Sequence, residues 1–241
     1  MITKNRIKFI RSLHRKKERI QHQMFIVEGE KPVQELLLAG AHLDSIYYTD
    51  ALFLKKPETD GELVSSKEMG MISTMKSPPG LLAVCNYLQW KNPDFNSGKY
   101  ILLDRINDPG NLGTIVRIAD WFGINAIICS TDSVDLYNSK TIQASMGSLF
   151  KLPVFYFDLD QFILNLDKNA IVVGADIVGA PLNEFNFPEN GFLLMGSESH
   201  GIDPRLESVI TQKVTISKSG NAESLNVAVA AGILVNKFIN A

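Results

Sequence analysis

NLGTIVR at residues 111–117 is the first of three short polar segments that decide the fold of this chain. The other two are GSESHG at residues 196–201 and SGNAESLN at residues 219–226. Each follows a short apolar run that is typical of a buried strand, at residues 101–103, 192–195 and 214–216. Open α/β sheets bind their ligands at the carboxyl ends of the strands. Three such segments, with Asn, Glu, Ser or Arg beside Gly, therefore predict one shared site at the strand ends.

Apolar strand patterns alternate with helix patterns from residue 100 to the last residue. We expect strands near residues 100–103, 126–129, 153–157, 170–174, 192–195 and 213–216. We expect helices near residues 112–122, 139–147, 159–166, 203–210 and 224–239. Continuous apolar strands separated by helices are typical of a parallel sheet covered on both faces, so the predicted class is α/β.

The first 90 residues predict a smaller α/β unit. Helices are expected at residues 4–19, 32–38 and 66–73, and strands at residues 25–27, 45–49 and 81–87. Residues 89–99 interrupt this pattern with Pro, Asn and Gly. We therefore predict two domains, at 1–90 and 99–241, joined by a linker at 91–98.

Basic residues are concentrated near the N-terminus. The net charge is −2, yet eight of the 24 Lys and Arg residues lie between positions 4 and 19, opposed only by Glu18. They are Lys4, Arg6, Lys8, Arg11, Arg15, Lys16, Lys17 and Arg19. Such a cluster is typical of contacts with nucleic-acid phosphates, but it also occurs on solvated helix faces. The charges alone leave both interpretations open.

Composition disfavours several other classes of protein. Cys85 and Cys129 lie in apolar runs, which predicts buried, reduced thiols in a cytoplasmic protein. No Cys/His spacing indicates zinc, and we predict no metal. The apolar stretch at residues 227–235 is too short to span a bilayer, and the charged N-terminus does not resemble a signal peptide, so no membrane partner is expected. The glycine fingerprints of phosphate loops and of dinucleotide-binding folds are missing, which disfavours an ordinary Rossmann enzyme.

Two polar residues each allow two interpretations. Arg117 lies on an otherwise apolar helix pattern, where it suits binding of a phosphate or an oxyanion, or pairing with Asp120 at i+3. Ser224 either belongs to the predicted site or caps the last helix. Small residues at 228–232 permit close approach of another backbone or subunit.

The three polar segments resemble the three sequence motifs of the SpoU/TrmH family of RNA ribose 2′-O-methyltransferases, which belongs to the SPOUT superfamily. Motif one is matched by Asn111-x-Gly113-x-x-x-Arg117-x-Ala119, motif two by residues 194–202 and motif three by residues 222–232. Ser197 departs from the pattern, because the family commonly has Asn there. RSL at residues 11–13 and FIVEG at residues 25–29 resemble the substrate-binding domain often joined to this family.

The resemblance implies a fold and a set of ligands. The C-terminal part is expected to contain a deep trefoil knot that binds S-adenosylmethionine, and the chain is expected to form a homodimer. The implied cofactor-binding residues are Gly174, Ala175, Leu194, Met195, Gly196, Ile216 and Leu225. The implied catalytic residues are Asn111, Arg117, Glu198, Ser224 and Asn226.

The implied reaction transfers a methyl group from S-adenosylmethionine to a ribose 2′-hydroxyl of RNA. The N-terminal domain, with its eight basic residues, is then expected to bind the RNA. By analogy with the family, the presence of this separate domain favours ribosomal RNA of the 23S type over tRNA as the substrate. The alternatives are a tRNA ribose 2′-O-methyltransferase and a non-catalytic RNA-binding homologue.

The chemistry restricts the role of Arg117. The acceptor 2′-hydroxyl must lose its proton as it attacks the sulfonium methyl, but arginine stays protonated in proteins and is a poor general base. We expect Arg117 to hold the RNA phosphate and to stabilise the developing alkoxide, while the phosphate or water takes the proton.

Overall fold

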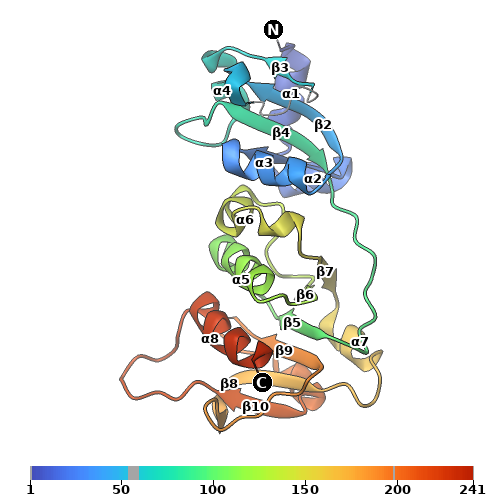
Figure 1. Cartoon of the computed structure of the whole chain (residues 1–241), viewed down its shortest axis with the longest axis vertical. Helices are drawn as coiled ribbons and strands as arrows, with labels where there is room; N and C mark the ends of the chain where they lie inside the picture. The colour runs from blue at the N-terminus through green and yellow to red at the C-terminus, as the bar shows by residue number, and fades with distance from the viewer. Residues whose placement is uncertain (1, 54–59, 198, 241) are drawn as a thin grey trace.

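The chain folds around two separate sheets, one in each half of the sequence (Figure 1). The computed structural model describes residues 2–53, 60–197 and 199–240. The smaller sheet has four strands in the order β1-β4-β2-β3, and the larger has six in the order β10-β8-β9-β5-β6-β7. Residues 87–98, all of them described, contain no helix or strand and join the halves along one side of the molecule.

The N-terminal half is a small α/β unit, as expected. β4 pairs antiparallel with β1 and β2, whereas the short β3 lies parallel to β2. The strands are β1 (Met24–Glu28), β2 (Leu43–Tyr48), β3 (Glu62–Leu63) and β4 (Leu81–Asn86). The helices are α1 (Lys4–Ser12), α2 (Lys16–His22), α3 (Glu30–Leu38) and α4 (Ser66–Ile72), with a 3₁₀ turn η1 (Ala51–Phe53).

The single helix expected at residues 4–19 is wrong, because the chain forms α1 and α2 with a break between them. The carbonyls of Leu13 and His14, which would bond to the next helical turn, instead accept hydrogen bonds from the Arg19 guanidinium at 3.0 and 2.9 Å. Leu13 is buried, and the His14 ring bonds to the carbonyl of Ile72 on α4. Side-chain hydrogen bonds from Arg19 thus replace the helical backbone bonds at the break.

The C-terminal half contains the predicted parallel sheet. All five pairings of its six strands are parallel. The strands are β5 (Lys99–Leu103), β6 (Ala126–Ser130), β7 (Val154–Phe157), β8 (Val172–Pro181), β9 (Gly191–Met195) and β10 (Gln212–Thr215). The helices are α5 (Pro109–Trp121), α6 (Ser139–Ser145), η2 (Ser148–Phe150), α7 (Leu159–Leu164), η3 (Pro204–Val209) and α8 (Val227–Ile239).

Several of the expected elements differ from the observed ones in extent or type. β8 continues to Pro181, because its pairing with β10 resumes at Ala180 after a register shift. η3 is a 3₁₀ helix rather than the α-helix expected at residues 203–210. α8 begins at Val227 rather than at 224, because Asn226 provides its N-cap.

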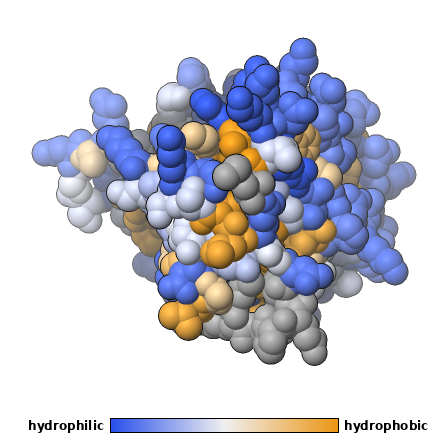
Figure 2. All heavy atoms as spheres, turned by 90° about the horizontal axis from the view of Figure 1, so that it is seen from above, coloured by the Kyte–Doolittle hydropathy of each residue, from blue (hydrophilic) through white to orange (hydrophobic). Residues whose placement is uncertain are grey.

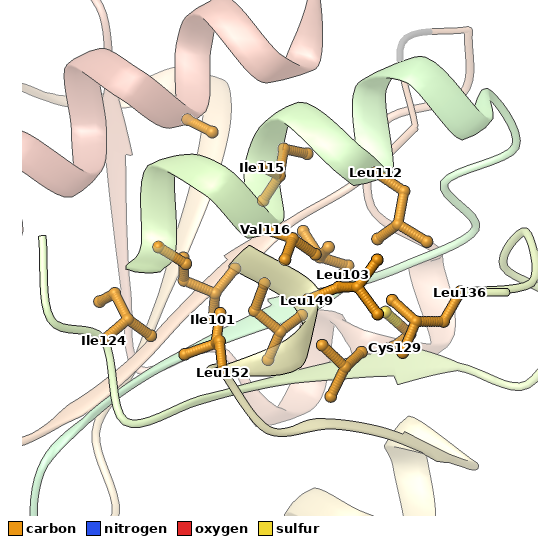
Figure 3. Close-up of a cluster of buried hydrophobic side chains, with 14 of the residues drawn as sticks. Ile101, Leu103, Leu112, Ile115, Val116, Ile124, Cys129, Leu136, Leu149 and Leu152 are labelled. Atoms are coloured by element: carbon orange, nitrogen blue, oxygen red, sulfur yellow. The ribbon is translucent and has the colours of Figure 1, made fainter. Parts of the chain in front are cut away.

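Apolar side chains cover both faces of the larger sheet, as predicted. On one face Leu103 packs in a core with Leu112, Ile115 and Val116 of α5, which Figure 3 shows, and the same core includes the buried side of α8. On the opposite face Leu102 packs with residues of α7 and η3. The strand ends, rather than the faces, are therefore the part of the sheet open to a ligand.

The two halves are packed together. The ring of Phe25 on β1 lies 4.3 Å from that of Tyr137, centroid to centroid, and belongs to the same core as β5. Arg19 pairs with Asp135 at 2.5 Å across this contact. The N-terminal unit is thus held in a defined position on the C-terminal one.

Cys85 and Cys129 are buried free thiols, as expected, and burial raises the pKa of both. Among the helices of the described residues, none has the length and apolar character needed to cross a membrane. The trefoil knot remains a prediction.

Candidate functional site

The three polar segments lie beyond the carboxyl ends of three strands of the larger sheet. They follow β5, β9 and β10, which are parallel and end at Leu103, Met195 and Thr215. Their common strand direction brings segments more than 100 residues apart in sequence to one edge.

A direct hydrogen bond joins the first and third segments. The Nδ2 of Asn226 donates to the Oδ1 of Asn111 at 3.0 Å. The Oδ1 of Asn226 meanwhile accepts from the backbone N–H groups of Ala228 and Val229 at 3.0 and 3.3 Å, which fixes the start of α8. Asn226 therefore fills the capping role considered for Ser224, which lies exposed in the preceding loop.

Asn111 lies in the first turn of α5. Asp108 caps this helix by accepting from the Asn111 backbone N–H at 2.8 Å, and Pro109 occupies the first turn, where no backbone donor is needed. The local sequence thus sets the helix start that positions the Asn111 side chain.

Arg117 extends from the exposed face of α5. None of the described residues forms a hydrogen bond or an ion pair with its guanidinium, and the pairing with Asp120 is not present. The helix face that carries Arg117 is not buried, so the folded chain does not remove much water from this cation and the desolvation cost is small. Its guanidinium is available to an anion that approaches α5.

The second segment forms a tight loop. Ser197 is buried and pairs with Gly201 in an isolated antiparallel bridge, in which the Gly201 N–H donates to the Ser197 carbonyl at 2.9 Å. A Cβ on Gly196 would lie 2.1 Å from the carbonyl carbon of Gly201, so only glycine fits there. The Ser197 Oγ accepts from the His200 N–H at 3.3 Å. Glu198 lies outside the described residues.

The expected cofactor residues lie on neighbouring strands or in the loops that follow them. Gly174 on β8 pairs with Leu194 on β9, and Met195 and Gly196 follow at the same edge. Ala175 adjoins Gly174, Ile216 follows β10, and Leu225 lies half-exposed before α8. Apolar side chains beside glycine backbone suit an adenosine group, which needs apolar contact and backbone hydrogen bonds.

Sequence reasoning missed a charged network beside this loop. Asp104 follows β5, is 3% exposed, and accepts from the Asp203 backbone N–H at 2.8 Å. Arg105 pairs with Asp104 at 3.1 Å and with Asp203 at 3.3 Å. Burial raises the pKa of Asp104, whereas bonds from Arg205 lower the pKa of Asp203 to about 2. No sequence pattern distinguishes these residues from ordinary surface charges.

The basic residues of the N-terminal unit separate into two groups. Arg6 bonds to the hydroxyls of Tyr47 and Ser45 and pairs with Asp44. Arg19 is 5% exposed and pairs with Asp135. The remaining six are exposed on α1, α2 and the break between them: Lys4, Lys8, Arg11, Arg15, Lys16 and Lys17. Figure 2, which views the molecule from the N-terminal end, shows mainly hydrophilic surface around smaller apolar areas.

Among the described residues, no group of three or more His, Cys, Asp or Glu side chains has the arrangement of a metal site.

Both halves of the chain match sequence models of known families. The sequence model of the SpoU rRNA Methylase family matches residues 98–236, and that of the MRM3-like substrate binding domain matches residues 4–83. The 23S rRNA (guanosine(2553)-2′-O)-methyltransferase RlmP of Bacillus subtilis is 32% identical over 95% of this chain and 94% of its own length.

Solved structures resemble the whole chain. A putative RNA methyltransferase of the TrmH family from Porphyromonas gingivalis has a TM-score of 0.88 at 37% identity, covering 99% of this chain and 98% of that one. An AdoMet-bound rRNA methyltransferase from Sinorhizobium meliloti has a TM-score of 0.87 at 29% identity, covering 100% and 96%.

Proposed function

The chain belongs to the SpoU rRNA methylase family, and we propose that it transfers a methyl group from S-adenosylmethionine to a ribose 2′-hydroxyl of 23S-type ribosomal RNA. The observation that carries this proposal is the hydrogen bond between Asn111 and Asn226. It joins two of the three motif segments at the strand edge where α/β sheets bind ligands. The likeness to RlmP over nearly its full length supports the choice of ribosomal RNA.

The cofactor is proposed to lie against Gly174 and Ala175 of β8 and against the loops that follow β9 and β10. The missing side chain of Gly196 lets the second loop fold closely against Gly201, while Ile216 and Leu225 offer apolar surface. S-adenosylmethionine, when bound, supplies the electrophilic sulfonium methyl group. The protein must then place the acceptor hydroxyl in line with that methyl, and positioning of this kind supplies much of the acceleration in two-reactant enzymes.

Arg117 is proposed to act on the RNA. Its guanidinium is exposed and not engaged by any described residue, so it can bind a phosphate oxygen through two parallel N–H groups. The same cation stabilises the alkoxide that develops as the 2′-hydroxyl loses its proton. Arginine keeps its own proton, so the RNA phosphate or water is the acceptor in this scheme.

The active enzyme is proposed to be a homodimer. Apolar side chains are exposed on α5, on α8 and before α8: Trp121, Leu225, Val229 and Ile233. Trp121 lies four residues after Arg117 and thus on the same face of α5. A partner that covers this surface would meet the site beside Arg117. A stable, active monomer at micromolar concentration in sedimentation would contradict this proposal.

The test of the function uses the full chain, S-adenosylmethionine and two substrates, 23S rRNA and bulk tRNA. We expect a single 2′-O-methylated nucleotide in the rRNA, detected by mapping methylated riboses with and without the protein. Methylation of tRNA alone would establish the tRNA alternative. RNA binding without cofactor binding in calorimetry would establish the non-catalytic one.

A further inference from the structure

Arg105 has an unusual backbone conformation. Its φ is +54°, in the left-handed region that non-glycine residues rarely adopt. Two other non-glycine residues of the described chain share this feature, Gln23 and Met146, and both lie at the C-caps of helices, where it is common. Arg105 instead lies two residues after the end of β5, so the surrounding contacts must hold it there.

Those contacts come from three separate segments. The Arg105 backbone N–H donates to the Oγ of Ser130 on β6 at 2.8 Å. The guanidinium pairs with Asp104 at 3.1 Å and with Asp203 at 3.3 Å, and it donates to the Gly201 carbonyl at 3.4 Å. One side chain thus connects the end of β5, the loop after β9 and the start of η3.

The buried carboxylate of Asp104 depends on this cation. Asp104 and Asp203 lie close together, and the Asp104 carboxylate also accepts from the Asp203 backbone N–H at 2.8 Å. Asp104 is buried, and a buried charge is costly unless it is paired and hydrogen-bonded. Without Arg105, the repulsion between these two groups would act directly on the loop that ends at Asp203.

The segments that Arg105 connects carry the proposed site. The loop it holds begins at Gly196, and β5 leads into α5, which carries Asn111 and Arg117. We infer that Arg105 is a positioning residue for the proposed methyl transfer, which fixes the loop after β9 in the shape that binds the cofactor. This inference rests on the proposed function.

Arg205 offers a matched control. It pairs with the same carboxylate, Asp203, at 3.0 Å, but its side chain is 72% exposed. No hydrogen bond or ion pair in the described structure joins it to Asp104 or Gly201. Replacing it removes a cation from Asp203 without releasing the loop.

The experiment compares the wild-type protein with Arg105→Gly, Arg105→Lys and Arg205→Ala. Glycine adopts a φ of +54° without strain, so Arg105→Gly removes the side-chain bonds while keeping the backbone conformation. The dissociation constant of S-adenosylmethionine is measured by calorimetry, its KM and kcat with the RNA substrate by methyl transfer, and Tm by thermal unfolding.

For Arg105→Gly we expect the dissociation constant and the KM for S-adenosylmethionine to rise about 10- to 100-fold, the size expected when a displaced loop loses one or two hydrogen bonds to its ligand. We expect Tm to fall as well, because Asp104 loses its partner in a buried position, and kcat at saturating cofactor to fall much less than KM rises. Arg105→Lys should recover part of the affinity, because an ammonium group retains the positive charge but not the planar, bidentate geometry of the guanidinium. Arg205→Ala should stay within about twofold of the wild type, because its exposed pair contributes little.

Wild-type affinity for the cofactor in Arg105→Gly would overturn the inference, as would a loss confined to Tm. If Arg105→Gly does not fold, Arg105→Lys decides: a wild-type Tm with weakened cofactor binding supports the inference, and equal binding overturns it. A wild-type protein that binds no S-adenosylmethionine would refute the proposed function, and the inference with it.

Discussion

Arg19 on α2 and Arg117 on α5 lie in opposite surroundings. The Arg19 side chain is buried, pairs with Asp135 across the contact between the two halves, and donates to two backbone carbonyls. The Arg117 side chain extends from an exposed helix face, and no described residue pairs with it. The first cation is used within the fold, and the second is available to a ligand.

The difference shows that the role of a cationic side chain depends on the groups that contact it rather than on its neighbours in sequence. Arg19 belongs to the densest basic stretch of the chain, yet 116 residues separate it from the carboxylate that holds it. Arg117 lies among apolar residues, yet its face of α5 remains open to solvent. Four predictions test this contrast between structural and available charges.

Removing the buried cation should have the largest effect on stability. Arg19→Met leaves Asp135 without its partner in a largely buried position, and breaking one side of a buried pair costs about 3–5 kcal/mol. We expect a loss of this size in the free energy of unfolding, measured by urea denaturation. The control is Arg15→Ala, which breaks an exposed pair with Glu18 and should cost at most about 1 kcal/mol. Equal losses in both variants would contradict the structural role of Arg19.

Removing the available cation should affect catalysis instead. Arg117→Ala is expected to lower the single-turnover rate of methyl transfer about 100- to 1000-fold, as the loss of one oxyanion donor does in other enzymes. Its affinity for S-adenosylmethionine and its Tm should match the wild type, and Arg117→Lys should restore activity only in part. Asp120→Ala is the control and should retain activity, because Asp120 does not pair with Arg117. Near-wild-type turnover by Arg117→Ala would remove this residue from the mechanism.

The exposed basic residues should determine the salt dependence of RNA binding. Lys16→Ala combined with Lys17→Ala should reduce the slope of log K against log salt by about 0.7–0.9 for each phosphate that the protein no longer neutralises. Cofactor affinity should not change. Deleting residues 1–20 is a poorer test, because it also removes the buried Ile10, Leu13 and Arg19. An unchanged slope would show that this surface does not bind RNA phosphates.

The smallest effect is expected from replacing His14, at the break between α1 and α2, and it concerns the pH dependence of stability. Burial lowers the pKa of its imidazole below the ordinary value of 6.5. The unfolded chain therefore takes up the proton first as pH falls, so this contribution to stability is complete above about pH 6.5 and is lost below it. His14→Gln should flatten the fall in the free energy of unfolding between about pH 7 and pH 5. A His14→Gln variant whose free energy of unfolding falls as steeply as that of the wild type would rule out a role for His14.

The sequence by itself determined the architecture. Alternating apolar strands and helices predicted the parallel sheet covered on both faces, because burial on two faces requires continuous apolar strands. The three polar segments predicted a common edge, because parallel strands end at the same side of a sheet. Local rules of this kind depend on residues that are close together in the chain.

Only the tertiary structure decided which polar groups are bound and which are free. Asn226 reaches Asn111 across 115 residues, and it provides the cap of α8 that the sequence had allowed Ser224 to provide. Arg105 lies between two carboxylates, one adjacent to it and one 98 positions further along the chain. The net value of a hydrogen bond or ion pair depends on its geometry and on how much water is removed from it. Both are set by the packing of distant segments, which no local pattern in the sequence records.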